Sequence, residues 1–173
     1  MSRRRRWAPA ATAGALLILA GALGGCTSDE APQLRPLGSI PTDDLVYDNR
    51  AAGFTMTFPP SWHGRYDVDA RSGPIAAAQW PFTTHAITFV YKPVEPDQPE
   101  PVLVALLVYH RGGWNQIAPG PNPPGMVVAE QDDDVYVAAV ADSNPFPPGS
   151  QDGQNFEGMR LTAAQVKEGL TLR

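Results

Sequence analysis

Hydrophobic and polar residues alternate from residue 53 to residue 58, a pattern typical of a β-strand with one buried face. The apolar side of this run carries Phe54, Met56 and Phe58, and threonines stand between them. The pattern predicts a half-buried strand. Pro59-Pro60 should end it, because proline lacks the N–H that a sheet ladder requires. A turn at 61–64 leads into a second alternating run, 65–70, and we expect the two runs to pair as a hairpin.

Residues 102–109 are apolar on both faces, which marks the strand expected at the centre of the sheet. The run reads Val-Leu-Val-Ala-Leu-Leu-Val-Tyr. A strand of this kind needs cover on both sides, and we expect helix on one of them. The other segments expected along the chain are 75–80, an alternating strand 85–92, a proline-rich loop 93–101, a short helical turn 114–118, and strands 126–129 and 135–141 joined by a polar turn.

The last third of the chain has the spacing of helices. The apolar positions there are Phe156, Met159, Leu161, Val166 and Leu170. Thr162 and Gln165 have the spacing of a capping box at the start of a last short helix. Strands followed by helices predict an α+β fold, with a central antiparallel sheet, an N-terminal hairpin and helices packed on the sheet.

The N-terminus has the layout of an export signal. Arg3–Arg6 form a basic cluster, and residues 15–20 are apolar. The apolar region spans about 15 residues, whereas a membrane-spanning helix needs roughly 20. Leu23-Gly24-Gly25-Cys26 then resembles the lipobox of bacterial lipoproteins, and Cys26 is the only cysteine in the chain. The resemblance implies that residues 1–25 are removed as a signal peptide and that Cys26 becomes the acylated N-terminus.

This resemblance also implies a location and a first partner. The protein would lie on the extracytoplasmic face of the cell membrane or outer membrane, held by the acyl chains on Cys26. Thr27, in place of Asp, favours the outer membrane where there are two membranes. One alternative is a soluble secreted protein with a free thiol. The arginine cluster also resembles a twin-arginine export signal, although the usual Phe-Leu is missing.

Composition indicates one domain on a tether. Residues 26–44 are polar and contain several prolines, as a flexible tether does, and residues 45–173 are expected to form a single domain. Loss of the signal with its four arginines leaves nine basic against 18 acidic residues, a charge of about −9. Nucleic acid is therefore not an expected partner, because it requires clustered Lys and Arg. With Cys26 acylated, no disulfide can form.

The segment from Tyr47 to Trp62 is similar to the opening of PsbP-like exported lipoproteins. It contains Gly53-Phe54, the alternating strand, Pro59 and then Ser61-Trp62. The resemblance implies a central antiparallel sheet flanked by helices, in which the two phenylalanines pack, Pro59 stops the strand and Trp62 covers the sheet edge. Only the fold follows from it, because function belongs to sites.

Candidate catalytic and metal-binding residues show no specific motif. His63, His85 and His110 have no close ligand spacing, and Asp132-Asp133-Asp134 lacks the spacing of a calcium loop. None of the serines considered as nucleophiles has a Gly-x-Ser-x-Gly elbow, and there is no phosphate-binding glycine loop. These serines are Ser39, Ser61, Ser72, Ser143 and Ser150. We therefore expect no catalytic residue, metal or cofactor. The alternative is a small envelope hydrolase or metal-dependent enzyme built around the histidines.

Five aromatic residues are candidates for a binding surface, because they lie near the ends of expected elements and beside proline-rich loops. They are Trp62, Trp80, Tyr109, Trp114 and Phe146. They could line a groove for a peptide or sugar, or they could cap the sheet and close the core. The sequence thus favours a non-catalytic protein that binds an envelope protein or cell-wall component. An assembly or stress factor without a small ligand is a third possibility.

Overall fold

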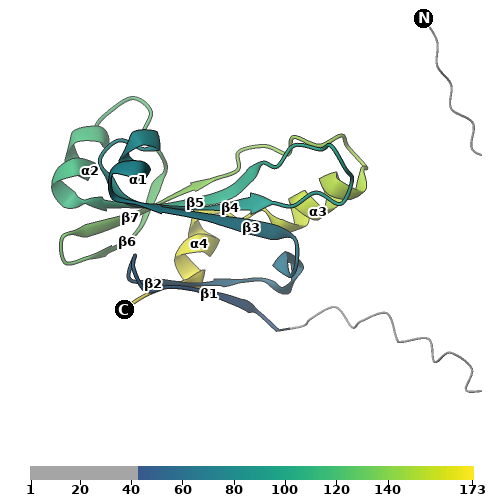
Figure 1. Cartoon of the computed structure of the whole chain (residues 1–173), viewed down its shortest axis with the longest axis horizontal. Coiled ribbons are helices and arrows are strands. Elements are labelled where there is room, and N and C mark those ends of the chain that lie inside the picture. The colour runs from purple at the N-terminus through teal and green to yellow at the C-terminus, as the bar shows by residue number, and fades with distance from the viewer. Residues whose placement is uncertain (1–42) are drawn as a thin grey trace, which may run out of the picture. The chain divides into compact units, whose positions relative to one another are not determined.

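Two antiparallel sheets face each other in residues 43–173, the part of the chain that the computed structural model describes. The strand order is β1-β2-β8 in the smaller sheet and β3-β4-β5-β7-β6 in the larger, and Figure 1 shows one above the other. The fold is therefore α+β, as predicted. The signal peptide, Cys26 and nearly all of the tether lie outside the described residues. The strands are β1 Leu45–Asn49, β2 Phe54–Phe58, β3 Tyr66–Ser72, β4 Thr83–Tyr91, β5 Val102–His110, β6 Met126–Gln131, β7 Asp134–Val140 and β8 Leu170–Leu172.

β2 is the middle strand of the smaller sheet, and its apolar side chains face the core as its alternation predicts. Phe54, Met56 and Phe58 are fully buried. The expected pairing of β2 with the next strand is wrong: β2 pairs with β1 and β8, whereas β3 pairs with β4 in the larger sheet. A 3-10 turn, η1 (Pro60–Trp62), and Gly64, with a φ of +69°, carry the chain from one sheet to the other. Alternation marks a strand but not its partner, so it could not show this crossing.

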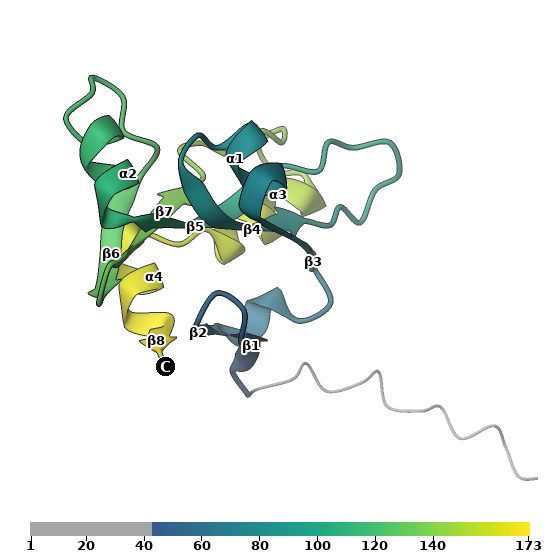
Figure 2. The same ribbon diagram turned by 60° about the vertical axis from the view of Figure 1, so that its left-hand side comes forward.

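β5 is the central strand of the larger sheet, as predicted. It pairs with β4 and β7, and its residues 103–109 are buried. The smaller sheet lies over one face, and helices α1 (Gly73–Gln79) and α2 (Arg111–Ile117) cover the other, as Figures 1 and 2 show. Segment 75–80, grouped above with the expected strands, is mostly helix. Pro74 in the first turn and three alanines after it favour that helix.

The main core lies between the sheets and is rich in aromatic rings. Trp62 stacks on Phe58 with ring centroids 4.1 Å apart, and Phe89 meets Phe58 edge-on at 4.8 Å. Trp62 also donates a hydrogen bond from Nε1 to the carbonyl oxygen of Met159, 3.0 Å away. This bond ties the aromatic cluster to α3 (Gln151–Met159). The end of the sandwich near Trp62 is therefore closed by packing.

The C-terminal helices form as the spacing predicts. α4 (Ala163–Gly169) begins at Thr162, and the capping box with Gln165 is present. Val166 of α4 and Phe156 of α3 are fully buried in the main core. The short strand β8 that follows α4 was not predicted. No helix within residues 43–173 is long and apolar enough to cross a membrane.

The buried carboxylate of Asp152 holds the loop 93–101 in place. It accepts hydrogen bonds from Tyr91 Oη at 2.7 Å, from the Val94 backbone N–H at 2.8 Å and from the Glu95 backbone N–H at 3.1 Å. Burial by itself raises the pKa of this carboxyl. The three donors and the charge of Arg65 outweigh that effect, so the pKa lies below its ordinary value. Asp152 is therefore a structural carboxylate.

Candidate functional site

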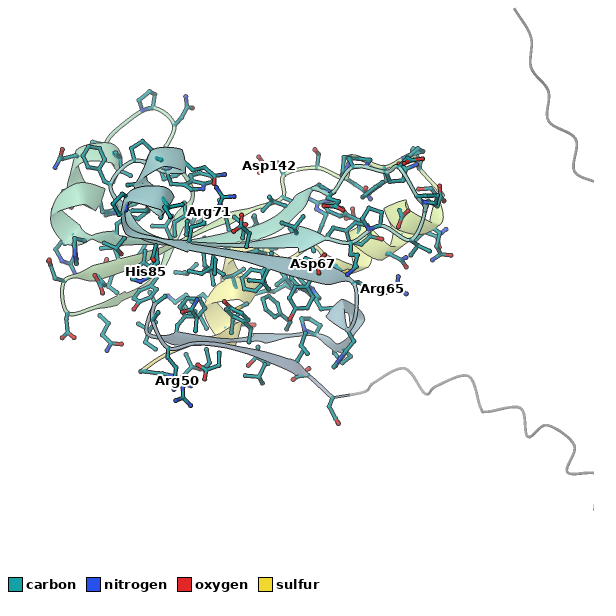
Figure 3. The ribbon with its side chains drawn as sticks, in the orientation of Figure 1. Arg50, Arg65, Asp67, Arg71, His85 and Asp142 are labelled. Carbon is teal, nitrogen blue, oxygen red and sulfur yellow. The ribbon has the colours of Figure 1, made fainter. Side chains whose placement is uncertain are left out.

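A polar pocket opens at the end of the sandwich that lies away from Trp62. The β1–β2 turn, the β6–β7 turn and the start of β4 meet there around a cavity of about 210 Å³. Figure 3 shows Arg50 and His85 at this end, and Arg65 and Asp67 at the other. We call this cavity the polar pocket. Its lining residues are Arg50, Ala51, Ala52, Gly53, His85, Gln131, Asp132, Asp134, Tyr136 and Arg173.

Tyr136 connects the two sheets beside the pocket. Its hydroxyl donates a hydrogen bond to the carbonyl oxygen of Ala52, 3.1 Å away in the β1–β2 turn. Gly53 has a φ of +74°, and a Cβ there would lie 3.2 Å from Tyr136 Oη. Burial raises the pKa of Tyr136, and the negative charges of Asp134 and Asp132 raise it further. Both carboxylates therefore act on the pocket electrostatically.

The cations of the pocket belong to the smaller sheet. Arg50 lies in the β1–β2 turn, and Arg173 directly follows β8. Both pair with Asp48: Arg173 Nη2 is 2.8 Å from Oδ1, and Arg50 Nε is 3.5 Å from Oδ2. The Arg50 side chain is 85% exposed. Its guanidinium is thus only loosely held, which leaves it able to meet a ligand.

The carboxylates of the pocket belong to the larger sheet. Asp132 lies in the β6–β7 turn with a φ of +52°, and Asp134 begins β7. Asp134 Oδ1 is 3.0 Å from His110 Nδ1 at the end of β5. Asp132 makes no ion pair with any residue from 43 to 173. This side of the pocket therefore has an excess of negative charge.

The structure separates the three histidines into different surroundings. His63 Nε2 lies 2.9 Å from the Asp43 carbonyl oxygen beside η1. His85 lines the polar pocket, and His110 is exposed beside Asp133 and Asp134. Within the described residues, no three His, Cys, Asp or Glu side chains are grouped so that they could hold a metal ion.

The serines that the structure describes have structural partners or none. Ser61 donates a hydrogen bond to the Gly158 carbonyl oxygen, and Ser150 caps α3. Ser72 lies opposite His85 in the register of β3 and β4. No hydrogen bond joins a serine to a histidine in residues 43–173. Ser39 lies outside the described part.

The five aromatic residues considered above do not form one surface. Trp62 and Phe146 are buried in the main core, and Tyr109 is buried under α1 and α2. Trp80 and Trp114 are partly buried beside Tyr109. Trp62, Tyr109 and Phe146 expose too little surface to line a groove, which corrects that expectation. Their positions agree with the alternative in which aromatic rings close the core.

Two wider surface hollows lack the charge arrangement of the polar pocket. One runs along α1, with a volume of about 550 Å³, and Arg71 is its single charged group. The other lies between β2 and α4, with a volume of about 420 Å³, and its charged groups are Asp44 and Glu168. The polar pocket has charges of both signs on separate walls. Charge arrangement, which determines which ligand can be recognised, makes it the candidate site.

Sequence reasoning identified only part of this site. His85 and the aspartates were considered as metal ligands, but nothing suggested that they share a pocket. Arg50, Tyr136 and Arg173 were missed, because the pocket forms only when turns of two different sheets meet. The one signal available was the run of aspartates at 132–134, since the β1–β2 turn contains a single charged residue, Arg50.

No protein-family model, no curated protein and no solved structure matches the chain. A functional proposal therefore depends on the motif at residues 23–26 and on the geometry of the polar pocket.

Proposed function

We propose that the chain is a lipid-anchored protein of the cell envelope whose domain binds an envelope component without catalysing a reaction. The binding partner would be an envelope protein or a cell-wall component. The observation that carries the binding role is the polar pocket, where opposite charges on the two sheets flank a cavity. A ligand that enters can replace water at both walls at once.

The anchor in this proposal is Cys26. The sequence Leu23-Gly24-Gly25-Cys26 after a basic and apolar N-terminus supports acylation and attachment to the extracytoplasmic face of the cell membrane or outer membrane. Residues 27–42 can extend over at most about 55 Å. The described domain begins before β1, whereas the polar pocket lies just beyond the far end of that strand. The pocket is therefore separated by the length of β1 from the place where the tether joins the domain.

A PsbP-like arrangement is the finer proposal for the fold. It is supported by the roles of four residues in the segment that carries the resemblance. Phe54 and Phe58 pack in the core, β2 ends just before Pro59, and Trp62 covers the end of the sandwich. An experimental structure in which no helix packs on an antiparallel sheet, or in which Phe54, Phe58 and Trp62 are exposed, would contradict it.

Fatty-acid labelling tests the anchor. Cells that express the full chain are grown with labelled palmitate, and we expect label in the wild type and none in Cys26→Ala. A Ser28→Ala variant is the control, because it changes a neighbouring small residue and keeps the lipobox. Label that persists in Cys26→Ala would overturn the anchor.

Site-specific cross-linking tests the binding role. A photoreactive amino acid replaces Ala51, which lines the polar pocket, or Ala78, an exposed alanine on α1. We expect an envelope component to be cross-linked from position 51 and not from position 78. Equal yields from both positions would contradict the site. Hydrolysis of ester or peptide substrates that disappears in His85→Ala would favour the enzyme alternative instead.

A further inference from the structure

The two walls of the polar pocket carry opposite charge and do not close on each other. Arg50 and Arg173 come from the smaller sheet, and Asp132 and Asp134 come from the larger. No ion pair of the described residues joins an arginine of this set to either aspartate. The cavity lies between them, so each wall can offer its charge to a ligand.

Neighbouring residues neutralise each wall only in part. Asp48 pairs with both arginines, and it lies closer to Arg173 (2.8 Å) than to Arg50 (3.5 Å), so the exposed Arg50 guanidinium can still meet a ligand. On the opposite wall, His110 Nδ1 lies 3.0 Å from Asp134, and Asp132 forms no ion pair with any of the residues 43–173. A ligand with a single charge would be attracted by one wall and repelled by the other. A ligand that carries both charges meets an opposite charge at each end.

The size of the cavity limits the ligand. At about 210 Å³ it is smaller than the roughly 300 Å³ at which pockets for drug-sized ligands begin. Gly53 contributes to the open space, since a Cβ at this position would approach Tyr136 Oη to 3.2 Å. The Tyr136 hydroxyl already donates to Ala52, so its oxygen remains available as an acceptor for an N–H group.

We propose that the polar pocket binds a small zwitterion, of the size of an amino acid or dipeptide, with its ammonium group toward Asp132 and Asp134 and its carboxylate toward Arg50. This inference rests on the proposed function in one respect, which is that the domain binds rather than catalyses. It adds the chemical class of the ligand. A free amino acid or a dipeptide has this chemistry, because its ammonium and carboxylate groups are only a few bonds apart.

Titration with glycylglycine tests the proposal. The full chain with Cys26→Ser, which has no acylation site, is labelled with ¹⁵N and titrated while amide shifts are recorded. We expect a dissociation constant of about 1 mM, with the largest shifts in the two turns that line the pocket. N-acetylglycine lacks the ammonium group and glycinamide lacks the carboxylate. Each should bind about fivefold more weakly, the effect of losing one exposed ion pair.

Two variants assign the charges of the ligand to the walls. In Asp132→Asn, glycylglycine should bind no better than N-acetylglycine does to the wild type. In Arg50→Gln, it should bind no better than glycinamide. Glu168→Gln and Arg71→Gln remove the same kinds of charge from the hollow between β2 and α4 and the hollow along α1, and they should leave binding unchanged. The amide spectrum of each variant shows directly whether it has folded.

Three results would overturn the inference: no shifts in the pocket up to about 50 mM glycylglycine, equal affinity for glycylglycine and both analogues, or binding that neither pocket variant weakens. Palmitate labelling and cross-linking from position 51 do not depend on the zwitterion. If they succeed while the titration fails, the ligand class is wrong and the proposed function stands.

Discussion

Replacing Asp152 with Asn should destabilise the domain through the loss of one buried charge. Three donors converge on this carboxylate: Tyr91 Oη, the Val94 backbone N–H and the Glu95 backbone N–H. Hydrogen bonds to a charged group contribute about 1.5–3 kcal/mol each, and a buried donor left unpaired costs about 1–3 kcal/mol. An amide whose oxygen takes the place of Oδ1 keeps the bonds from Tyr91 and Val94 as weaker, uncharged ones, but it turns its NH₂ group toward the Glu95 N–H. We therefore expect Asp152→Asn to cost about 3 kcal/mol at pH 7.

The penalty should depend on pH in a defined direction. Burial raises the pKa of Asp152, but the hydrogen bonds and the charge of Arg65 leave it below the ordinary value of about 3.9. A carboxyl whose pKa is lowered by folding stabilises the native state above its unfolded pKa. That stabilisation is lost as the pH falls through the folded pKa. The difference in unfolding free energy between wild type and Asp152→Asn should stay constant from neutral pH to about 5 and shrink below about 4.

Urea unfolding followed by tryptophan fluorescence measures this difference. Tyr91→Phe should cost about 1 kcal/mol, because it removes one donor and leaves the carboxylate its two backbone N–H groups. Asp142→Asn changes an exposed aspartate and should stay within about 0.5 kcal/mol of wild type. A cost of less than about 0.5 kcal/mol for Asp152→Asn at pH 7 would contradict the structural role of this carboxylate. A full penalty that persists at pH 3 would contradict it as well.

Three further predictions concern stability. Gly125→Ala should cost about 2 kcal/mol in urea unfolding, because its Cβ would clash with the Ala138 carbonyl oxygen. Gly158→Ala in α3 adds a Cβ that meets nothing within 4 Å and should be neutral or stabilising. Thr162→Ala should cost about 1 kcal/mol by removing the capping box of α4, and an equal cost in Thr171→Ala would argue against the cap as the cause. Burial raises the pKa of Tyr109 to about 12, so the wild type loses stability as the pH rises above about 10, where the unfolded tyrosine releases its proton. The free energy of unfolding of Tyr109→Phe minus that of the wild type should therefore be about 1 kcal/mol larger at pH 11 than at pH 7. The same difference at both pH values would contradict this.

Local patterns in the sequence predicted elements well because each pattern reports the burial of its own residues. The alternation of Phe54, Met56 and Phe58, the apolar run 102–109 and the Thr162–Gln165 capping box all reappear in the structure. Strand pairing could not be predicted in the same way. β2 and β3 are separated by only seven residues and both alternate, yet they lie in different sheets. Choosing a partner for each strand requires knowledge of long-range contacts, such as those of β8 with β2.

The burial of the aromatic residues also depends on long-range contacts that the sequence does not show. A tryptophan near a strand end is equally consistent with a binding surface and with a ring that covers the end of the hydrophobic core. Which of the two it is depends on elements far along the chain, because they decide whether the ring is buried. Trp62 is covered by α3, about a hundred residues later, through its bond to the Met159 carbonyl oxygen. The polar pocket is likewise made by residues from opposite halves of the domain. The sequence therefore indicated the acidic turn at 132–134 but could not show that it meets the β1–β2 turn.

The contrast between the two ends of the sandwich explains why the pocket can exist. Near Trp62 the sheets are joined by stacked rings and α3. At the other end they are joined by polar bonds: Tyr136 Oη to the Ala52 carbonyl oxygen at 3.1 Å, and Gln131 Nε2 to the Arg173 carbonyl oxygen at 2.6 Å. These bonds hold the walls at a fixed separation without filling the space between them. Tyr136→Phe removes one of these bonds together with the hydroxyl oxygen that can accept from the ligand, so it should weaken glycylglycine binding while the charges of both walls remain.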